Sequence, residues 1–327
     1  MLLRPLHYLT LICILFSCQH SPVEQRFNAD ASLGQMPNPE EWGHGGIILT
    51  TDEVYPGIGS MKPTSTHGFQ PGEYDRTAIK KNLAEKMKNG EPWIAHVLVP
   101  LCDNDNQGIV PVNSSLGNGQ NPHTNLYWGA GYGLKTHFQR SADWKSIPLY
   151  CPFTDHILRQ VAFEKTFPEG NTVIVVMQAY DGAYMKDCLE DYFDFLSGNK
   201  QLAVRRKDGG LIKVGQDADL IALNGHNGLM DVDVDIPASK DGIHRDAVAI
   251  ACISHDYFRE PLARAGGYPL VCTTGLMAPE AYVMRAVLDA WGGGKAPADI
   301  RTAAGAAYHK YQKCGIKGAT NLFRTGW

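Results

Sequence analysis

The chain contains 327 residues, of which 44% are hydrophobic and 20% are charged, a composition typical of a globular protein. Its 30 Lys and Arg residues against 34 Asp and Glu give a net charge of −4. This balance excludes a dedicated nucleic-acid-binding protein, because neutralising phosphates requires a surplus of basic residues. The aromatic content of 9% excludes a mostly disordered chain, and no apolar run long enough to span a bilayer follows the N-terminal segment.

The first 18 residues have the pattern of a bacterial lipoprotein signal. Arg4 precedes a short apolar run, and the run ends in Leu15-Phe16-Ser17-Cys18, which resembles a lipobox. We therefore expect residues 1–17 to be a signal peptide and Cys18 to carry fatty acyl groups such as palmitate. A protein of this kind is lipid-anchored to a membrane of the cell envelope and faces the periplasm or the exterior. The alternatives are an ordinary cleaved signal and a buried strand.

The segment after the signal is polar. Residues 18–42 contain Pro, Gly, Ser and Asn, as expected of a tether between the lipid and a folded domain. We expect residues 43–327 to form a single α/β domain. Six cysteines lie in this domain, and none has the C-x-x-C spacing typical of zinc or redox sites.

Apolar runs alternate with helical patterns along residues 43–327. Strands are predicted at 46–50, 93–101, 172–178, 219–224, 247–252 and 270–274. Helices are predicted at 75–89, 154–167, 183–196, 279–291 and 297–313. Most of the strands are continuously apolar, which indicates a sheet buried on both faces, and strands separated by helices imply parallel crossovers. The sequence therefore predicts a mainly parallel sheet of about five to six strands flanked by helices.

One long segment interrupts this alternation. Residues 102–152 follow a strong predicted strand and are rich in Gly, Asn and aromatic residues. So long a loop is uncommon unless it is functional, and open α/β sheets place their sites at the carboxyl ends of strands. The candidates for a substrate cleft in this loop are Asp103, Tyr127, Trp128 and Tyr132. Alternatively, the aromatic side chains pack the loop onto the domain.

Two chemically competent residues follow neighbouring predicted strands. Strand 219–224 continues into Gly225-His226-Asn227-Gly228, and strand 247–252 ends in Cys252. If the strands are parallel neighbours, their carboxyl ends lie about 4.8 Å apart, so the imidazole and the thiol can approach each other. Nucleophilic cysteine chemistry needs such a base beside the thiol. Gly225 and Gly228 would let backbone N–H groups face a developing oxyanion.

Other histidines fit the role of base less well than His226. His44 precedes its predicted strand, and His255 lies only three residues beyond Cys252. Taken singly, a histidine after glycine and a cysteine in an apolar strand are each more often structural than catalytic. The order of the two residues at consecutive strand ends is what favours a catalytic pair.

These strand ends resemble the caspase-like cysteine peptidases, a group that includes caspases, legumain, gingipains, clostripain, separase and the CHAT peptidases. That family carries its histidine at the end of one core strand and its cysteine, usually after a small residue, at the end of the next; His226 and Ala251-Cys252 match. The resemblance covers residues 93–292 as topology and implies a caspase-like three-layer sandwich in which Cys252 attacks a peptide bond. Two residues depart from the pattern, because Asn227 replaces a glycine and Ile250 replaces a polar residue.

Three aspartates alternate directly after the histidine, in Asp231-Val232-Asp233-Val234-Asp235. Near a cleft, Asp231 and Asp233 would favour a basic substrate side chain. Alternatively, the run is a solvated edge strand whose charges prevent pairing with another chain.

The sequence thus predicts a membrane-anchored extracytoplasmic thiol hydrolase, a cysteine peptidase with a His226–Cys252 pair that acts on a peptide or protein substrate. The prediction includes no cofactor, metal or nucleic-acid partner, and no H-E-x-x-H or comparable ligand spacing supports a metal-dependent hydrolase. The alternative from a different class is a non-catalytic surface lipoprotein of caspase-like fold that binds a ligand through the 102–152 loop.

Overall fold

The computed structural model describes residues 75–152, 154 and 156–327. The predictions for the signal peptide, the Cys18 anchor, the tether, and His44 with its strand lie outside the described residues.

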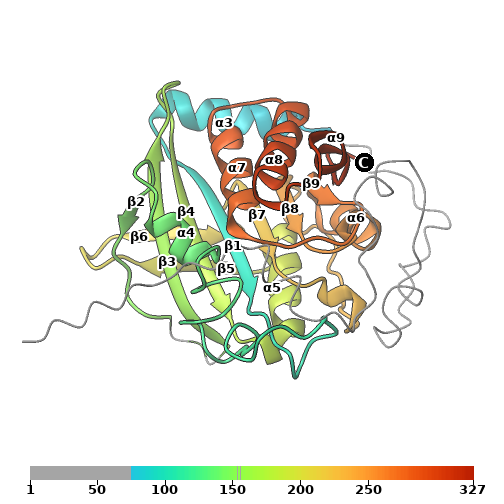
Figure 1. The fold of residues 1–327 in the computed structure, drawn as a ribbon. Coiled ribbons are helices and arrows are strands. Elements are labelled where there is room, and N and C mark those ends of the chain that lie inside the picture. The colour runs from blue at the N-terminus through green and yellow to red at the C-terminus, as the bar shows by residue number, and fades with distance from the viewer. Residues whose placement is uncertain (1–74, 153, 155) are drawn as a thin grey trace, which may run out of the picture. The chain divides into compact units, whose positions relative to one another are not determined.

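Eight strands form one mixed sheet in the order β10-β9-β8-β7-β1-β4-β3-β2 (Figure 1). Its parallel centre consists of β1 (Trp93–Pro100), β4 (Thr172–Tyr180), β7 (Leu220–Asn224), β8 (Arg245–Ile250) and β9 (Gly267–Thr273). Antiparallel strands extend the two edges: β2 (Lys145–Ile147), β3 (Ile157–Thr166) and β10 (Phe323–Arg324). Every residue of β1, β7 and β8 is buried, as expected for apolar strands covered on both faces. The five predicted strands that lie within the described residues are therefore present and parallel, and the additional strands of this sheet are antiparallel.

The order in which the chain adds parallel strands to the sheet reverses between β1 and β7. From β1 the chain passes to β4 on one side, and then returns to build β7, β8 and β9 on the other side. In doubly wound sheets, ligands bind in the crevice outside the carboxyl ends of the strands at such a switch point. The loops that follow β1 and β7 therefore occupy the place where a site is expected.

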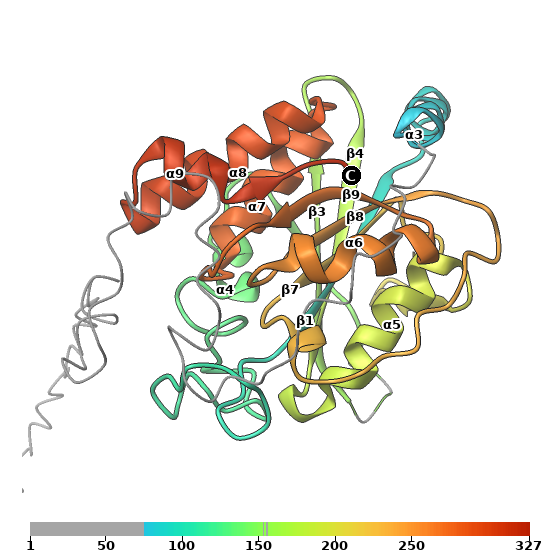
Figure 2. The same ribbon diagram turned by 90° about the vertical axis from the view of Figure 1, so that its right-hand side faces the viewer.

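Helices cover both faces of the sheet (Figure 2). One face carries α3 (Thr77–Asn89), α4 (Leu134–Gln139), α7 (Ala281–Gly292) and α8 (Pro297–Gln312), with α9 (Ile316–Asn321) beside α8. The other face carries α5 (Met185–Ser197), α6 (Ser254–Ala265) and the hairpin of β5 (Gln201–Arg205) and β6 (Leu211–Gly215). Two short 3₁₀ helices, η2 (Gly182–Tyr184) and η3 (Gly228–Met230), follow β4 and β7. The three-layer α/β sandwich expected from the sequence is confirmed.

The helix α3 shows how local sequence sets an element. Ile79 and Leu83 lie one turn apart and are the buried residues of the helix. The helix ends at Gly90, which adopts the left-handed conformation at φ 71° and donates its N–H back to the last turn. Lys86 and Lys88 in that turn complement the negative end of the helix dipole.

The helix predicted at 154–167 is wrong, because this segment forms strand β3. It pairs antiparallel with β4 from Ile157 opposite Tyr180 to Thr166 opposite Thr172. The spacing of Ile157 and Val161 fits a helix, but an irregularity in the strand after Ile157 places these two residues in the cores on opposite faces of the sheet. Pairing along the whole of β4 satisfies the backbone of the segment, and this long-range partner decides the structure.

Buried charges hold α3 to the amino edge of the sheet. The guanidinium of Arg76 donates to both carboxylate oxygens of Asp246, over 2.7 and 2.6 Å. Trp291 Nε1 donates to the same carboxylate over 2.8 Å, and Asp246 is completely buried. A second carboxylate, that of Asp219, accepts from Lys86 on α3. Paired charges thus fix both the residue that precedes α3 and the last turn of the helix.

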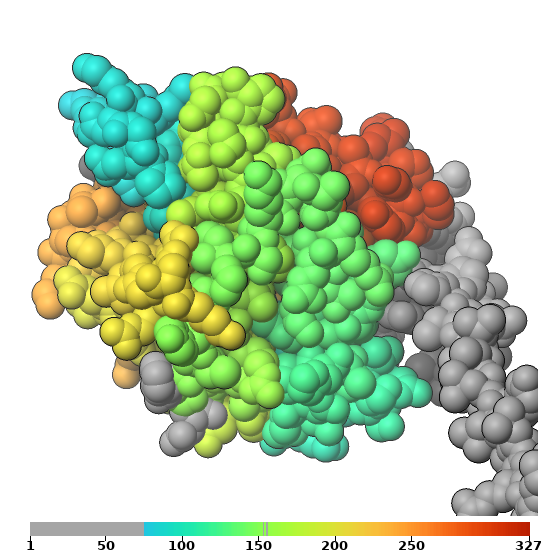
Figure 3. All heavy atoms as spheres, turned by 90° about the vertical axis from the view of Figure 1, so that its left-hand side faces the viewer, coloured from blue at the N-terminus to red at the C-terminus, as the bar shows by residue number. Residues whose placement is uncertain are grey.

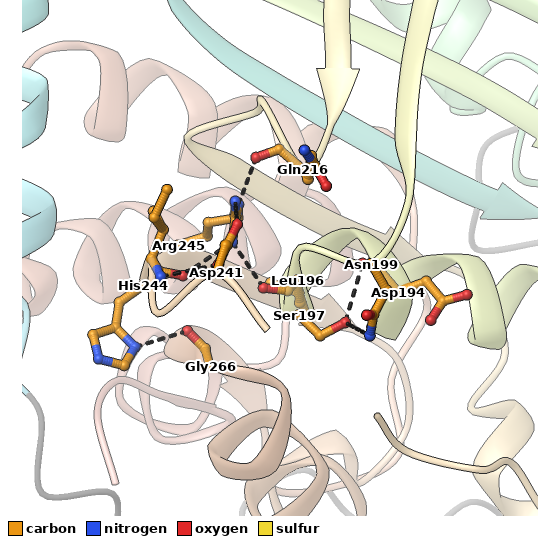
Figure 4. A network of polar contacts seen from close by, with 10 residues as sticks. Asp194, Leu196, Ser197, Asn199, Gln216, Asp241, His244, Arg245 and Gly266 are labelled. Atoms are coloured by element: carbon orange, nitrogen blue, oxygen red, sulfur yellow. Dashed lines mark hydrogen bonds and ion pairs between the residues drawn. The ribbon is translucent and has the colours of Figure 1, made fainter. Parts of the chain in front are cut away.

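A further polar network connects β8 to the layer that contains α5 and the β5–β6 hairpin (Figure 4). The side chain of Arg245 is buried and donates to the carbonyls of Leu196 and Gln216 and to the carboxylate of Asp241. Because its donors are satisfied, the guanidinium can be buried at this position. The network therefore links the start of β8 to the end of α5 and to the turn after β6.

Within the described part of the chain, no helix combines the length and the apolar character needed to cross a bilayer.

Candidate active site at the carboxyl edge of the sheet

His226 and Cys252 lie at the same level of neighbouring parallel strands. Asn224 at the end of β7 is opposite Ile250 at the end of β8. His226 and Cys252 each follow two residues later, so both leave the sheet at its carboxyl edge. The two loops are in direct contact, because Asn227 Nδ2 donates to the carbonyl of Cys252 over 2.8 Å.

Cys252 lies on a sharp turn from strand to helix. The next residue, Ile253, has φ 49° and is one of two non-glycine residues with positive φ in the described chain. A β-branched residue rarely adopts this left-handed conformation, and such strained positions cluster at functional sites. The N–H of Ile253 donates to the carbonyl of Gly275 over 3.0 Å, and α6 begins at Ser254. The strain therefore lies directly beside the thiol.

The sulfur of Cys252 packs against the loop that follows β9. The N–H of Met277 donates to Sγ over 3.4 Å, and the thiol donates to the carbonyl oxygen of Met277 over 3.5 Å. Burial raises the pKa of the Cys252 thiol, and the Met277 N–H offsets only part of this effect. The resting thiol is therefore protonated at neutral pH and needs a base to become a nucleophile. All six cysteines of the described chain are free thiols.

His226 is held by a carboxylate on its own loop. Its Nε2 lies 2.7 Å from Asp231 Oδ2, and the N–H of Gly108 donates to the same oxygen over 2.9 Å. Burial raises the pKa of Asp231, but the hydrogen bond and charge of His226 and the Gly108 N–H lower it further, leaving it below its usual value. An ionised carboxylate only accepts hydrogen bonds, so the neutral imidazole carries its hydrogen on Nε2. Nδ1 is then the basic nitrogen.

This placement gives Asp231 a role that the sequence did not indicate. The sequence suggested a cleft carboxylate or a solvated edge strand, whereas residues 231–239 contain no strand. The 3₁₀ turn η3 folds Asp231 back onto His226. Asp233 lies further along this loop and is exposed. Within the described residues, no hydrogen bond joins His226 to the Cys252 thiol.

The glycine N–H groups proposed for an oxyanion are already engaged. Gly225 donates to the carbonyl of Ile250 and Gly228 to that of His226, each over 3.1 Å. The glycines are needed for packing, since a Cβ on Gly228 would lie 2.3 Å from the Met185 side chain. Among the residues described here, the N–H groups of Asn227 and Cys252 have no hydrogen-bond partner.

The candidate cleft residues of the 102–152 loop are mostly internal. Asp103 is 1% exposed, and its carboxylate accepts hydrogen bonds from Asn106 and Gln120 within the loop. Tyr127 and Trp128 are buried in the core. Tyr132 is partly buried and packs edge-on against Tyr282 at a ring separation of 6.1 Å.

Aromatic packing thus attaches this loop to the domain, as the alternative interpretation expected. Figure 3 shows the segment in green beside β3 and β4. One of its side chains also lies close to the thiol: burial raises the pKa of Tyr127, and the nearby sulfurs of Cys102 and Cys252 add to the effect.

Within residues 75–152, 154 and 156–327, no three His, Cys, Asp or Glu side chains gather in a way that could hold a metal ion. Comparison of the chain with protein-family models, with curated proteins and with solved structures finds no match in any of the three.

Proposed function

We propose that the protein is a thiol hydrolase that cleaves peptide bonds, with Cys252 as the nucleophile and His226 as the proton carrier. The observation that carries the proposal is the placement of both residues at matching ends of β7 and β8, with the Asn227 amide between their loops. The caspase-like peptidases carry their histidine and cysteine at consecutive strand ends in this order, so the resemblance supports the same chemistry.

Each step of the reaction has a group in this arrangement. Nδ1 of the neutral His226 accepts the thiol proton as Sγ of Cys252 attacks the carbonyl carbon. The N–H groups of Asn227 and Cys252 donate to the oxyanion, and Asp231 stabilises the imidazolium that forms. The imidazolium then gives its proton to the leaving amine. Water then attacks the resulting thioester and gives a proton to His226; the C–S bond breaks, the acid product leaves, and the imidazolium returns the proton to Sγ.

Peptide hydrolysis by the purified full-length protein tests this proposal. We expect new termini in a mixed peptide library, identified by mass spectrometry, and we expect His226→Ala to abolish them. His123→Ala is the matched control, because His123 is an exposed histidine of the 102–152 loop. Absence of cleavage for every peptide, or full cleavage by His226→Ala, would contradict the proposal.

The Asp231→Asn substitution should lower kcat by a factor on the order of 10²–10⁴ with little change in KM. It keeps the shape of the side chain but removes the charge that stabilises the His226 imidazolium. Steady-state kinetics over a range of pH measures the effect. A change confined to KM would show that Asp231 acts on substrate binding instead.

The same substitution should have a pH-dependent effect on stability. The pKa of Asp231 is lower in the folded protein than its usual value of about 3.9, so ionised Asp231 stabilises the fold above that value. The stabilisation is lost as the pH falls through the lowered pKa. We therefore expect the difference in Tm between the wild type and Asp231→Asn to shrink as the pH falls below about 4. A difference that does not depend on pH would contradict the assignment.

We also propose that Cys18 anchors the protein to a membrane of the cell envelope, with the domain in the periplasm or outside the cell. The Cys18→Ala substitution should release the protein from the membrane fraction or leave an unprocessed precursor. Fractionation followed by mass measurement of the N-terminal peptide decides this. Normal processing with unchanged membrane association would contradict the anchor.

A further inference from the structure

Buried hydroxyl groups hold the backbone that leads to Cys252. The regular pairing of β8 with β9 stops short of this residue. Beyond the paired region, the Ser254 hydroxyl donates to the carbonyl of Ala249 over 2.6 Å. The Thr273 hydroxyl, on β9, donates to the carbonyl of Ala251. Side chains therefore supply hydrogen-bond donors to carbonyls in the last residues before the thiol.

The residues that carry these two hydroxyls also hold each other in place. The N–H of Thr273 donates to Ser254 Oγ over 2.9 Å, and the N–H of Ser254 donates to Thr273 Oγ1 over 3.2 Å. Both residues are completely buried. A buried polar network with satisfied members is rigid, because moving one group leaves another unpaired in a medium of low dielectric constant. The turn from β8 into α6 is therefore anchored to β9 through this pair.

Carbonyl directions alternate at the end of β8. The carbonyls of Ile250 and Cys252 accept hydrogen bonds from the loop that follows β7, over 3.1 and 2.8 Å. The carbonyl between them, that of Ala251, points the other way, to Thr273 on β9. In a trans peptide group the C=O and the N–H point in opposite directions. The N–H of Cys252 therefore points towards the loop that carries His226.

We propose that Thr273, supported by Ser254, is a positioning residue that directs the Cys252 N–H at the oxyanion. This inference rests on the proposed function and adds how one of its oxyanion donors is held. Such a donor is effective when it is fixed before charge develops, so that no reorganisation is needed during the reaction. Without the Thr273 hydroxyl, the peptide group between Ala251 and Cys252 loses the bond that fixes its orientation. The hydroxyl acts on the backbone, so activation of the thiol by His226 should not depend on it.

Thr273→Val tests the inference, because it keeps the branched shape of the side chain and removes the hydroxyl. The measurement uses the full chain with Cys151→Ser, because Cys151 is exposed and would compete for thiol reagents. For a peptide that this parent protein cleaves, we expect kcat to fall by about 10–10²-fold with little change in KM. Alkylation of Cys252 by iodoacetamide should keep the parent rate, because the thiolate displaces iodide from a saturated carbon and no oxyanion forms. Thr273→Ser keeps the hydroxyl and should restore kcat.

A matched control separates positioning from loss of stability. Ser197 is also completely buried, and its hydroxyl donates to the carbonyl of Asp194 in α5 over 3.1 Å. Ser197→Ala should lower Tm, as Thr273→Val does, but leave kcat unchanged. Ser254→Ala is the second variant, in case Thr273→Val does not fold. It removes the acceptor of the Thr273 N–H, so it should also lower kcat without slowing alkylation.

The outcomes separate this inference from the proposed function. Unchanged kcat in Thr273→Val and Ser254→Ala would overturn the positioning role and leave the thiol hydrolase standing. A parallel fall of hydrolysis and alkylation would also overturn it, because the damage would then lie in the thiol itself or in the fold. The same holds if Thr273→Ser is as inactive as Thr273→Val. Failure of the parent protein to cleave any peptide would overturn both the inference and the proposed function.

Discussion

Cys252→Ala should lower kcat/KM for peptide hydrolysis by at least about 10⁴-fold, because it removes the group that forms the covalent intermediate. The substitution removes only the sulfur and its contacts with Met277, so the fold should survive. Steady-state hydrolysis and thermal unfolding of the purified full chain give the two measurements.

Two further variants make this result specific to the thiol. Cys252→Ser keeps a hydrogen-bonding side chain of similar shape and should be nearly as inactive, because the hydroxyl is a far weaker nucleophile. Cys151→Ser removes an exposed thiol and should retain full activity. If Cys252→Ala retained more than about a tenth of the activity, the hydrolase would not depend on this cysteine.

Asp246→Ala should destabilise the protein by about 3–5 kcal/mol. The substitution leaves the guanidinium of Arg76, which is 8% exposed, without its two carboxylate contacts. It also removes the acceptor of Trp291 Nε1. A buried charge without a partner is costly, and here the loss would loosen α3 from the sheet. Urea unfolding of the wild type and the variant measures the difference.

The contribution of burial can be separated from that of charge. Asp208→Ala breaks an ion pair between the exposed Asp208 and the partly exposed Arg206, and it should cost much less stability than Asp246→Ala. The double variant Arg76→Met/Asp246→Leu removes both charges and should recover much of the lost stability. A loss below about 1 kcal/mol for Asp246→Ala would show that the buried pair contributes no more than a surface pair.

The sequence indicated the parallel centre of the sheet because its strands are continuously apolar. Strands of this kind require burial on both faces, and this requirement leads to a layered α/β fold. Helix ends at Gly90 and Gly198 were visible for a similar reason, because glycine adopts the left-handed C-cap without a Cβ penalty.

One element was missed because its structure depends on a partner distant in the sequence. The spacing of Ile157 and Val161 fits a helix, and only the pairing with β4 makes this segment the strand β3. The β5–β6 hairpin did carry a local signal, since Asp208-Gly209 is a favoured turn between two runs of largely alternating burial. The hairpin could therefore have been predicted from the local sequence, but it was not.

In the candidate site, residues with distinctive chemistry were easier to find than those that act through conformation. His226 and Cys252 stand out because their side chains suit catalysis and follow predicted strands. The contact of Asp231 with His226 depends on the turn η3, which the sequence did not indicate. The open N–H groups of Asn227 and Cys252 belong to the backbone, so side-chain identity gives no sign of them.

The catalytic pair is tested most directly by alkylation of Cys252 with iodoacetamide at neutral pH. The rate is compared between the Cys151→Ser protein and the double variant Cys151→Ser/His226→Ala. Burial raises the pKa of Cys102 and of Cys272 to about 12, so these thiols should react slowly in either protein. If His226 activates Cys252, this cysteine should be modified first, and His226→Ala should slow it by at least about tenfold with the fold unchanged by circular dichroism. Slow labelling of Cys252 at the rate of the buried cysteines, or labelling that does not depend on His226, would contradict the pair.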